Sequence, residues 1–414
     1  MPASAPIEER LSRAGLPRLR RSTWLEIDLS VLAANAAALR SMLPETARLA
    51  VVIKADAYGH GLVAAAHAAL AGGAAMLAVA TLDEALALRE AGFLARIIVL
   101  FPVPSDGLED GLAGDLDLVV ADADSLAAIL PLAPKGPRIH LAIDTGMSRG
   151  GFAPTDAVEA AHQLLAAGLA NLAGTWSHLA SPELADVSAR QAEAFQHALT
   201  MLNAAGIGAG VRHFVASGGL LEGVPTYDMA RVGISFYGHV PGELTATAKA
   251  RGAGLRPALT LKARAVSVQT IAAGESVGYG GEWTAGRESR IATLPIGYGD
   301  GWQRAYRGAI ASARGVDVPL VGRVNTDAIA IDVTDAPGFD ASDEVTLISA
   351  DGAGTSVEQL AQMRGSIVWE VIDDLMPRIA RVYLQDGQSF ALRQMDGRTV
   401  LARSAQLVSR ELPR

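Results

Sequence analysis

The chain has 414 residues, half of them hydrophobic, and a formal net charge of −9 at pH 7. Its length is sufficient for two domains with sizeable cores, and its acidic balance argues against nucleic acid or an anionic membrane as a main partner. The chain contains no cysteine, which excludes disulfides, thiolate metal sites and cysteine nucleophiles.

Residues 1–22 carry several arginines and two glutamates, but they lack the apolar core of a secretory signal. No apolar run along the chain reaches the roughly 20 residues that a membrane-spanning helix needs. We therefore expect a cytoplasmic protein with no membrane segment, in which residues 1–24 form a frayed N-terminal tail.

Short apolar strands alternate with Ala- and Leu-rich helical segments between residues 25 and 256. The predicted strands cover residues 49–53, 76–80, 97–100, 116–120, 139–143, 172–176, 212–216 and 229–234. Eight strand–helix units in this length predict a (β/α)8 TIM-like barrel of the α/β class. Periodicity alone leaves a doubly wound sheet as the alternative.

The pattern changes after Pro257 to alternating strands. These are predicted at residues 258–269, 290–294, 318–324, 328–333, 344–348, 381–384, 390–393 and 400–403. One helix is expected over residues 356–376, where Ser356 and Gln359 match a capping box. We therefore predict a mostly β C-terminal domain over residues 257–414, after a barrel over residues 25–256.

The first predicted barrel strand runs directly into Lys54, and a glycine-punctuated turn containing Tyr58 follows. This pattern is typical of a buried strand that presents an amine at its carboxyl end. Because burying an ammonium is costly, one explanation is a neutral amine that forms a Schiff base with the aldehyde of pyridoxal 5'-phosphate (PLP). The plainer alternative is a lysine whose charge reaches solvent at the strand end.

Barrel enzymes place their chemistry at the carboxyl ends of the strands, and polar residues gather there in this chain. Ser217 and the amides of Gly233 and Ile234 are candidates to bind a phosphate, with the phenol of Tyr58 as a further donor. Each also has a structural explanation: Ser217 could cap a helix, and Gly233 could allow close packing.

His178 follows the sixth predicted strand and Arg231 lies in the eighth. Alone, the histidine suggests a core residue and the arginine an ion-pair partner. Together they suggest that His178 orients Arg231 against the cofactor ring.

Six motifs, in order along the chain, resemble the alanine racemase family. They lie at residues 53–61, 144–147, 231–238, 276–280, 293–302 and 321–327, and the similarity extends from about residue 23 to the C-terminus. The resemblance implies a PLP-binding barrel and a β-rich C-terminal domain in a head-to-tail homodimer with shared active sites.

The same resemblance assigns roles to particular residues. Lys54 would carry PLP and act as one base, and Tyr279 would be the second base, supplied by the partner subunit. Arg231 would face the pyridine nitrogen and Arg149 would lie near the phenolic oxygen of PLP. The substrate entrance would be lined by Tyr298, Thr326 and Asp327, which the other subunit would supply. The implied reaction is the interconversion of L- and D-alanine, a peptidoglycan precursor.

Several positions depart from the family's pattern. Ala142 stands where many members have a carbamylated lysine that braces the arginine matching Arg149, so an anion, water or another side chain would have to hold that arginine. Thr326 and Asn325 replace a methionine and a common cysteine, and Pro377 replaces a gating tyrosine. Losing the phenol and the thioether predicts a wider pocket that accepts serine or longer amino acids besides alanine.

Other functions stay open at this point. PLP-dependent decarboxylases of this architecture usually rely on a cysteine in the second domain, which this chain lacks. Metal-dependent aldolases need a late histidine–acid pair, but all eight histidines precede residue 240, and we expect no metal site. A PLP-carrier protein would be a lone barrel, and the residues beyond 257 argue against it.

Overall fold

The computed structural model describes residues 5–349 and 351–403. The chain divides into two compact units. We call the unit formed by Leu32–Ala57 and Leu62–Arg256 the barrel unit, and the unit formed by Met1–Val31, Tyr58–Gly61 and Pro257–Arg414 the sheet unit. Each is described by itself.

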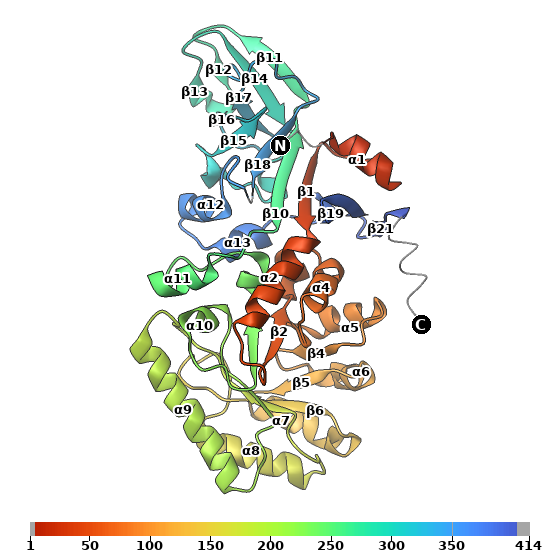
Figure 1. The fold of residues 1–414 in the computed structure, drawn as a ribbon, viewed down its shortest axis with the longest axis vertical. Coiled ribbons are helices and arrows are strands. Elements are labelled where there is room, and N and C mark those ends of the chain that lie inside the picture. Colours follow the sequence, from red (N-terminus) through yellow and green to blue (C-terminus); the bar gives the residue numbers. More distant parts are fainter. Residues whose placement is uncertain (1–4, 350, 404–414) are drawn as a thin grey trace. The chain divides into compact units, whose positions relative to one another are not determined.

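The barrel unit contains a closed barrel of eight parallel strands within residues 48–232, all of which the structure describes (Figure 1). The strands are β2 (Arg48–Val52), β3 (Met76–Val79), β4 (Arg96–Val99), β5 (Asp117–Val120), β6 (Arg138–Ala142), β7 (Gly174–Trp176), β8 (Val211–His213) and β9 (Met229–Val232). Each pairs with the next in chain order, and β9 closes the barrel on β2. The predicted barrel is confirmed, and each observed strand overlaps a predicted one.

Helices follow most of the barrel strands. They are α4 (Leu62–Ala71), α5 (Leu82–Glu90), α6 (Leu108–Ala113), α7 (Ala123–Ile129), α8 (Pro154–Ala166), α9 (Ala185–Ala204), α10 (Ser217–Glu222) and α11 (Ala246–Gly252), with α2 (Leu29–Ser41) before β2. A capping box between Thr81 and Glu84 starts α5, because the two side chains satisfy backbone N–H groups that the helix cannot. The short side chains on the buried face of α4 are alanines, which let a helix lie close to the strands.

The sheet unit is built on one large mixed sheet, which has eleven strands among the described residues. Their order is β11 (Ser267–Ile271), β14 (Ser289–Leu294), β17 (Ile329–Asp332), β16 (Val316–Val321), β15 (Ile310–Ala313), β18 (Glu344–Ile348), β10 (Leu259–Arg264), β1 (Thr23–Asp28), β19 (Ala380–Gln385), β20 (Gln388–Arg393) and β21 (Thr399–Leu401). A separate small hairpin joins β12 (Ser276–Val277) to β13 (Trp283–Thr284). The mostly β character expected after Pro257 is confirmed.

The helix expected over residues 356–376 is two helices, α12 (Val357–Arg364) and α13 (Val368–Asp373). The predicted capping box between Ser356 and Gln359 starts α12. The helix ends at Gly365, whose φ of 66° is left-handed and costs a glycine little. Periodicity did not reveal this break because both helices carry apolar faces.

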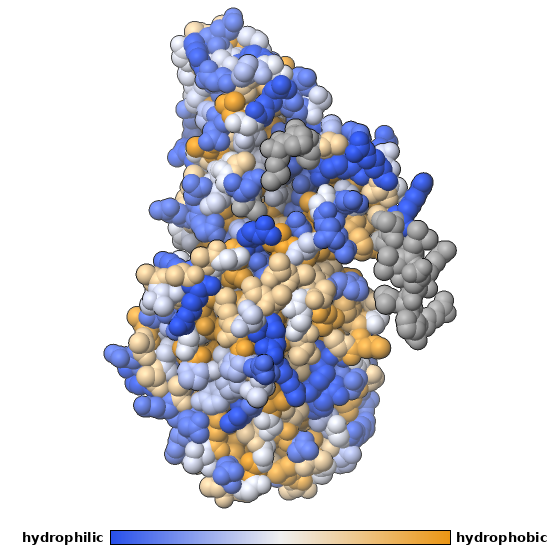
Figure 2. Space-filling view, viewed as in Figure 1, coloured by the Kyte–Doolittle hydropathy of each residue, from blue (hydrophilic) through white to orange (hydrophobic). Residues whose placement is uncertain are grey.

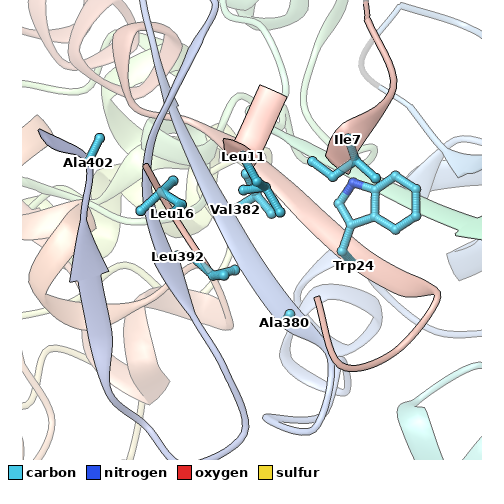
Figure 3. Close-up of a cluster of buried hydrophobic side chains, with 8 residues drawn as sticks. All are labelled: Ile7, Leu11, Leu16, Trp24, Ala380, Val382, Leu392 and Ala402. Atoms are coloured by element: carbon cyan, nitrogen blue, oxygen red, sulfur yellow. The ribbon is translucent and has the colours of Figure 1, made fainter. Parts of the chain in front are cut away.

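The N-terminal segment is not the expected tail. It forms α1 (Ile7–Ala14) and β1, and β1 pairs antiparallel with β10 and parallel with β19. Ile7 and Leu11, one helical turn apart, are buried with Trp24, Val382 and Leu392 (Figure 3). The prediction of a frayed tail is therefore wrong for the described part of residues 1–24, because its apolar face covers the sheet.

Hydrophilic and hydrophobic residues are mixed over the visible face of each unit (Figure 2). Among the described residues, no helix combines the length and the apolar character needed to cross a bilayer.

Candidate active site

The backbone after Lys54 turns in a left-handed helix, labelled α3 (Lys54–Tyr58). Residues 55–58 have φ angles between 51° and 56°, although none of them is glycine. An L-residue in this conformation loses about 1–2 kcal/mol, so four in succession are a concentrated strain. The turn therefore needs support from its surroundings. It sets the direction of the backbone just after β2 ends, where Lys54 lies at the rim of the barrel.

Two carboxylates of the barrel unit support this turn. The backbone N–H of Ala55 donates to Oε1 of Glu84 at 2.6 Å, and the backbone N–H of Leu62 donates to Oδ1 of Asp56 at 2.9 Å. The same Glu84 side chain caps α5, so α5 and the Lys54 turn share one anchor. Tyr58, at the end of the turn, is buried.

The structure brings His178 and Arg231 together, as the sequence suggested. Arg231 is 2% exposed, and its Nη2 donates to the carbonyl oxygen of Ser177 at 2.8 Å and to Nδ1 of His178 at 3.1 Å. Its Nη1 donates to Nδ1 of His213 at 2.8 Å. The guanidinium carbon also lies 4.8 Å from the ring centroid of Trp176, a favourable cation–π distance. Four neighbours thus fix this guanidinium.

Positive charge collects around His178. Burial, reinforced by the charges of Arg231, Arg149 and Lys54, lowers the pKa of His178 to about 3. The imidazole is therefore neutral at pH 7, and its Nδ1 can accept from Arg231. Burial and the nearby Arg149 lower the pKa of Arg231 to about 9, which still leaves it charged. Three cations therefore lie near His178, of which Arg231 is buried, Lys54 is partly buried and Arg149 is exposed, and together they favour an anionic ligand.

Ser217 opens α10 and its hydroxyl oxygen accepts two backbone N–H groups, from Gly233 at 3.0 Å and from Ser235 at 3.4 Å. Its own hydrogen can then point toward another acceptor. In this structure Gly233 therefore positions Ser217, rather than both amides pointing to a phosphate. Ile234 begins the buried 3-10 turn η3 (Ile234–Tyr237).

The loop between β6 and α8, which carries Arg149, is organised by Asp144. Its Oδ1 accepts the backbone N–H groups of three successive residues at 2.9–3.1 Å, namely Gly146, Met147 and Ser148. Gln191 from α9 joins this loop to the next one, because its Nε2 donates to Thr145 Oγ1 at 3.2 Å and to the carbonyl oxygen of His178 at 3.1 Å. Gln191 was not anticipated, since a polar residue inside a helix gives no signal of what it faces.

Tyr298 and Thr326 meet in the sheet unit. The hydroxyl of Thr326 donates to the phenol oxygen of Tyr298 at 2.5 Å, and the backbone N–H of Tyr298 donates to the carbonyl of Asn325 at 3.0 Å. The glycines beside the tyrosine allow this approach. A Cβ at Gly297 would lie 2.1 Å from the Asn325 oxygen, and one at Gly299 would lie 3.0 Å from the Thr326 oxygen.

Arg378 joins these residues to Asp327. Its Nε lies 2.8 Å from Oδ1 of the fully buried Asp300, and its Nη2 donates to Asp327. Pro377 directly precedes Arg378, so the chain places residue 377 next to the Tyr298–Asp327 group. Arg378 and Asp300 were not predicted as site residues, although Asp300 lies inside the motif at residues 293–302 and Arg378 directly follows Pro377.

Tyr279 lies on the turn η4 (Tyr279–Gly281) of the sheet unit and is 72% exposed. Gly278 and Gly280 beside it have φ angles of 76° and 75°. These conformations favour glycine and turn the phenol outward from a tight loop.

Two alanine racemase domain models match most of the chain, the N-terminal domain at residues 27–241 and the C-terminal domain at residues 258–383. The chain is 36% identical to the alanine racemase of Desulfovibrio desulfuricans over 375 residues, which is 88% of this chain and 99% of the relative. The chain belongs to the alanine racemase family. It is 37% identical to the alanine racemase of Beutenbergia cavernae over 371 residues, which is 86% of this chain and 97% of the relative.

Solved alanine racemases have the same fold. The Bacillus anthracis structure with bound L-Ala-P has a TM-score of 0.84 at 29% identity and covers 91% of this chain and 99% of its own. The structure from Streptomyces lavendulae has a TM-score of 0.81 at 32% identity, covering 89% and 98%. The protein is therefore an isomerase, which disfavours the decarboxylase, aldolase and PLP-carrier hypotheses.

The structure shows where Ala142 lies, the residue that stands in place of the family's carbamylated lysine. Ala142 is buried, ends β6 and pairs with Trp176 on β7. A methyl group cannot brace Arg149 as a carbamate would. The indole Nε1 of Trp176 is buried and has no hydrogen-bond partner in the described part of the chain.

Proposed function

We propose that this protein interconverts L- and D-alanine with PLP, using Lys54 and Tyr279 as two bases in active sites shared by two copies of the chain. The observation that carries the proposal is the cationic cluster of Lys54, Arg149 and the buried Arg231 around a neutral His178. PLP is anionic and aromatic, and its amino-acid substrate adds a carboxylate, so their chemistry fits this cluster.

The residues of the barrel rim fit PLP individually. Lys54 has the amine that binds the aldehyde, and the hydroxyl hydrogen of Ser217 can donate to the phosphate. Arg231 is held by His213, Ser177 and His178 through three N–H donors, and a guanidinium has five. Its remaining donors can therefore face the ring nitrogen without releasing a proton. PLP, when bound, withdraws electrons from the amino acid and acidifies its Cα–H bond.

Racemisation then requires a proton carrier on each face of Cα. Lys54 takes or returns the proton on one face, and Tyr279 does so on the other. Their reference pKa values, about 10.4 and about 10, are close to each other, which suits a reaction that runs in both directions. The exposure of Tyr279 supports its assignment to a neighbouring copy, because a base that serves a partner has to project from its own subunit.

Two variants test both the chemistry and the sharing. Lys54→Ala should lose activity and the near-visible absorbance of bound PLP, whereas Tyr279→Phe should keep the absorbance and lose exchange of the Cα proton with deuterated solvent. Mixing the two inactive variants should restore about a quarter of the wild-type activity, since half of the random dimers would have one complete site in two. Absence of any recovery would contradict the shared site.

We propose alanine as the main substrate and an extended range as a second candidate function. Thr326 supports the extended range, because its short side chain is hydrogen-bonded to Tyr298 and leaves free the space that a longer methionine side chain would fill. Pro377 supports it too, since it presents no phenol beside Arg378. Turnover of serine, lysine and methionine relative to alanine tests this range.

A further inference from the structure

A line of buried polar side chains continues from Arg231 through the interior of the barrel. Arg231 Nη1 lies 2.8 Å from Nδ1 of His213, His213 Nε2 lies 2.8 Å from Nδ1 of His140, and His140 Nε2 lies 3.0 Å from Oδ1 of Asp117. The side chains of Asp117, His140 and His213 are fully buried. We call these four residues the imidazole chain. Barrel interiors are usually filled by branched aliphatic side chains, so the imidazole chain is an unusual feature of this barrel.

The strands show that the imidazole chain crosses the interior. His140 is on β6 and His213 is on β8, and β7 lies between these strands. Their side chains therefore meet across β7, where the sequence has Gly174. A Cβ at Gly174 would lie 2.3 Å from Nδ1 of His140. The glycine thus leaves the space that the contact between the two imidazoles occupies.

The two ends of the imidazole chain determine the direction of every hydrogen bond in it. Asp117 is ionised and can only accept, so His140 donates from Nε2. A neutral His140 then has a bare Nδ1, which accepts from Nε2 of His213. The bare Nδ1 of His213 in turn accepts from Arg231, which can only donate. One arrangement of tautomers satisfies all three contacts, and a second proton on either imidazole would break one of them.

The charge states agree with this arrangement. Burial favours a higher pKa for Asp117, but hydrogen bonds from His140 and Arg96 outweigh it and lower the pKa to about 2. Arg138 also holds the carboxylate, with Nε 3.1 Å from Oδ2. Burial lowers the pKa of both His140 and His213, and Arg231 lowers that of His213 further. Both imidazoles are therefore neutral at pH 7, between an anion at one end and a cation at the other.

We propose that Asp117 and His140 are positioning residues for Arg231, because they fix the tautomer of His213 whose bare Nδ1 holds the guanidinium. This inference rests on the proposed function, in which Arg231 faces the ring nitrogen of PLP. If His213 carried its proton on Nδ1 instead, that N–H would oppose an N–H of Arg231. Two donors facing each other repel, so the guanidinium would move away from its position.

The test compares His140→Leu with His140→Gln. Leucine breaks the imidazole chain at similar volume, whereas the glutamine amide can accept from His213 and donate to Asp117 as a neutral imidazole does. In ¹⁵N-histidine spectra of the holoenzyme, wild type and His140→Gln should show a neutral His213 protonated on Nε2. His140→Leu should lose this signal and lower kcat at least about tenfold, the effect of losing one hydrogen bond near a charge, with KM little changed.

The outcomes separate this inference from the proposed function. A wild-type enzyme that binds no PLP and racemises nothing would overturn the proposed function. Normal racemisation with a charged or Nδ1-protonated His213 would overturn the imidazole chain alone, and so would equal kcat in both variants. If His140→Leu fails to fold, the wild-type spectrum and the glutamine variant still decide.

Discussion

The carboxylate of Glu84 accepts the backbone N–H of Ala55 at 2.6 Å, one residue beyond the proposed Schiff-base lysine. The same carboxylate accepts the N–H groups of Ala80 at 2.8 Å and of Thr81 at 3.2 Å. One side chain at the start of α5 therefore stabilises a left-handed turn whose conformation is unfavourable for each of its residues.

Glu84→Ala should weaken PLP binding and lower kcat, because the turn after Lys54 loses the acceptor that offsets its strain. Loss of a hydrogen bond to a charged group costs about 1.5–3 kcal/mol, which corresponds to roughly a tenfold or larger loss in affinity. Titration of the purified apoenzyme with PLP measures it. Glu90→Ala, an exposed change at the end of the same helix, is the matched control, and equal affinities for the two variants would contradict this role.

Stability should fall as the pH is lowered below about 6.5, the ordinary pKa of an unfolded histidine. The pKa of folded His178 is lowered to about 3, and those of His140 and His213 are lowered too. Between the unfolded and the folded pKa, the unfolded state binds a proton that the folded state does not bind. Each imidazole therefore lowers the free energy of unfolding by up to about 1.4 kcal/mol for each pH unit. Urea unfolding at a series of pH values measures the slope.

His178→Gln should make that dependence shallower, because one of the buried imidazoles is gone. His162→Gln, a change at an exposed position on α8, should leave it unaltered. A slope that is the same in wild type and in His178→Gln would show that this imidazole does not stay neutral in the folded protein.

Thr326→Met should narrow the substrate range. A longer side chain would fill the space beside Tyr298 and remove the hydrogen bond between the two hydroxyls. Since pockets discriminate by about 1–3 kcal/mol per methylene, the ratio of kcat/KM for lysine to that for alanine should fall about tenfold or more. Thr326→Val removes the hydroxyl at constant size, so a matching drop there would assign the effect to the hydrogen bond instead. If the wild-type enzyme turns over alanine alone, there is no extended substrate range to narrow, and the prediction fails.

Gly297→Ala should destabilise the loop that carries Tyr298, because the added Cβ would lie 2.1 Å from the carbonyl oxygen of Asn325. Forced backbone shifts of this kind cost about 1–3 kcal/mol. Gly286→Ala, where nothing lies within 4 Å, should change the free energy of unfolding by less than about 0.5 kcal/mol. Urea unfolding measures the free energy of unfolding of both variants. Equal values would show that the loop accommodates the added Cβ without loss of stability.

The barrel could be predicted because strands covered on both faces appear in the sequence as short, continuous apolar runs. The Lys54 motif is local in the same sense. The imidazole chain was not anticipated, since His140 and Asp117 lie on different strands and meet only through the register between β5 and β6. A single sequence does not contain that register.

Two further features lay beyond the sequence for other physical reasons. The left-handed turn consists of residues that rarely adopt positive φ, so propensity pointed away from it. The N-terminal segment was expected to be a tail because α1 is only two turns long and its apolar residues, Ile7 and Leu11, are few. Its place was decided by the sheet that it covers, which, apart from the adjoining β1, forms from residues more than two hundred positions away.

Strand β1 lies between β10 and β19, near the middle of the order of the large sheet. On the ribosome, this early strand therefore emerges long before either neighbour. At synthesis rates of about 5–20 residues per second, its first partner follows only after roughly ten to fifty seconds, during which the whole barrel is made. A strand that contains Trp24, Leu25 and Ile27 and stays unpaired for this long would be a substrate for a chaperone, and a fragment starting at Pro257 would lack the strand that joins β10 to β19.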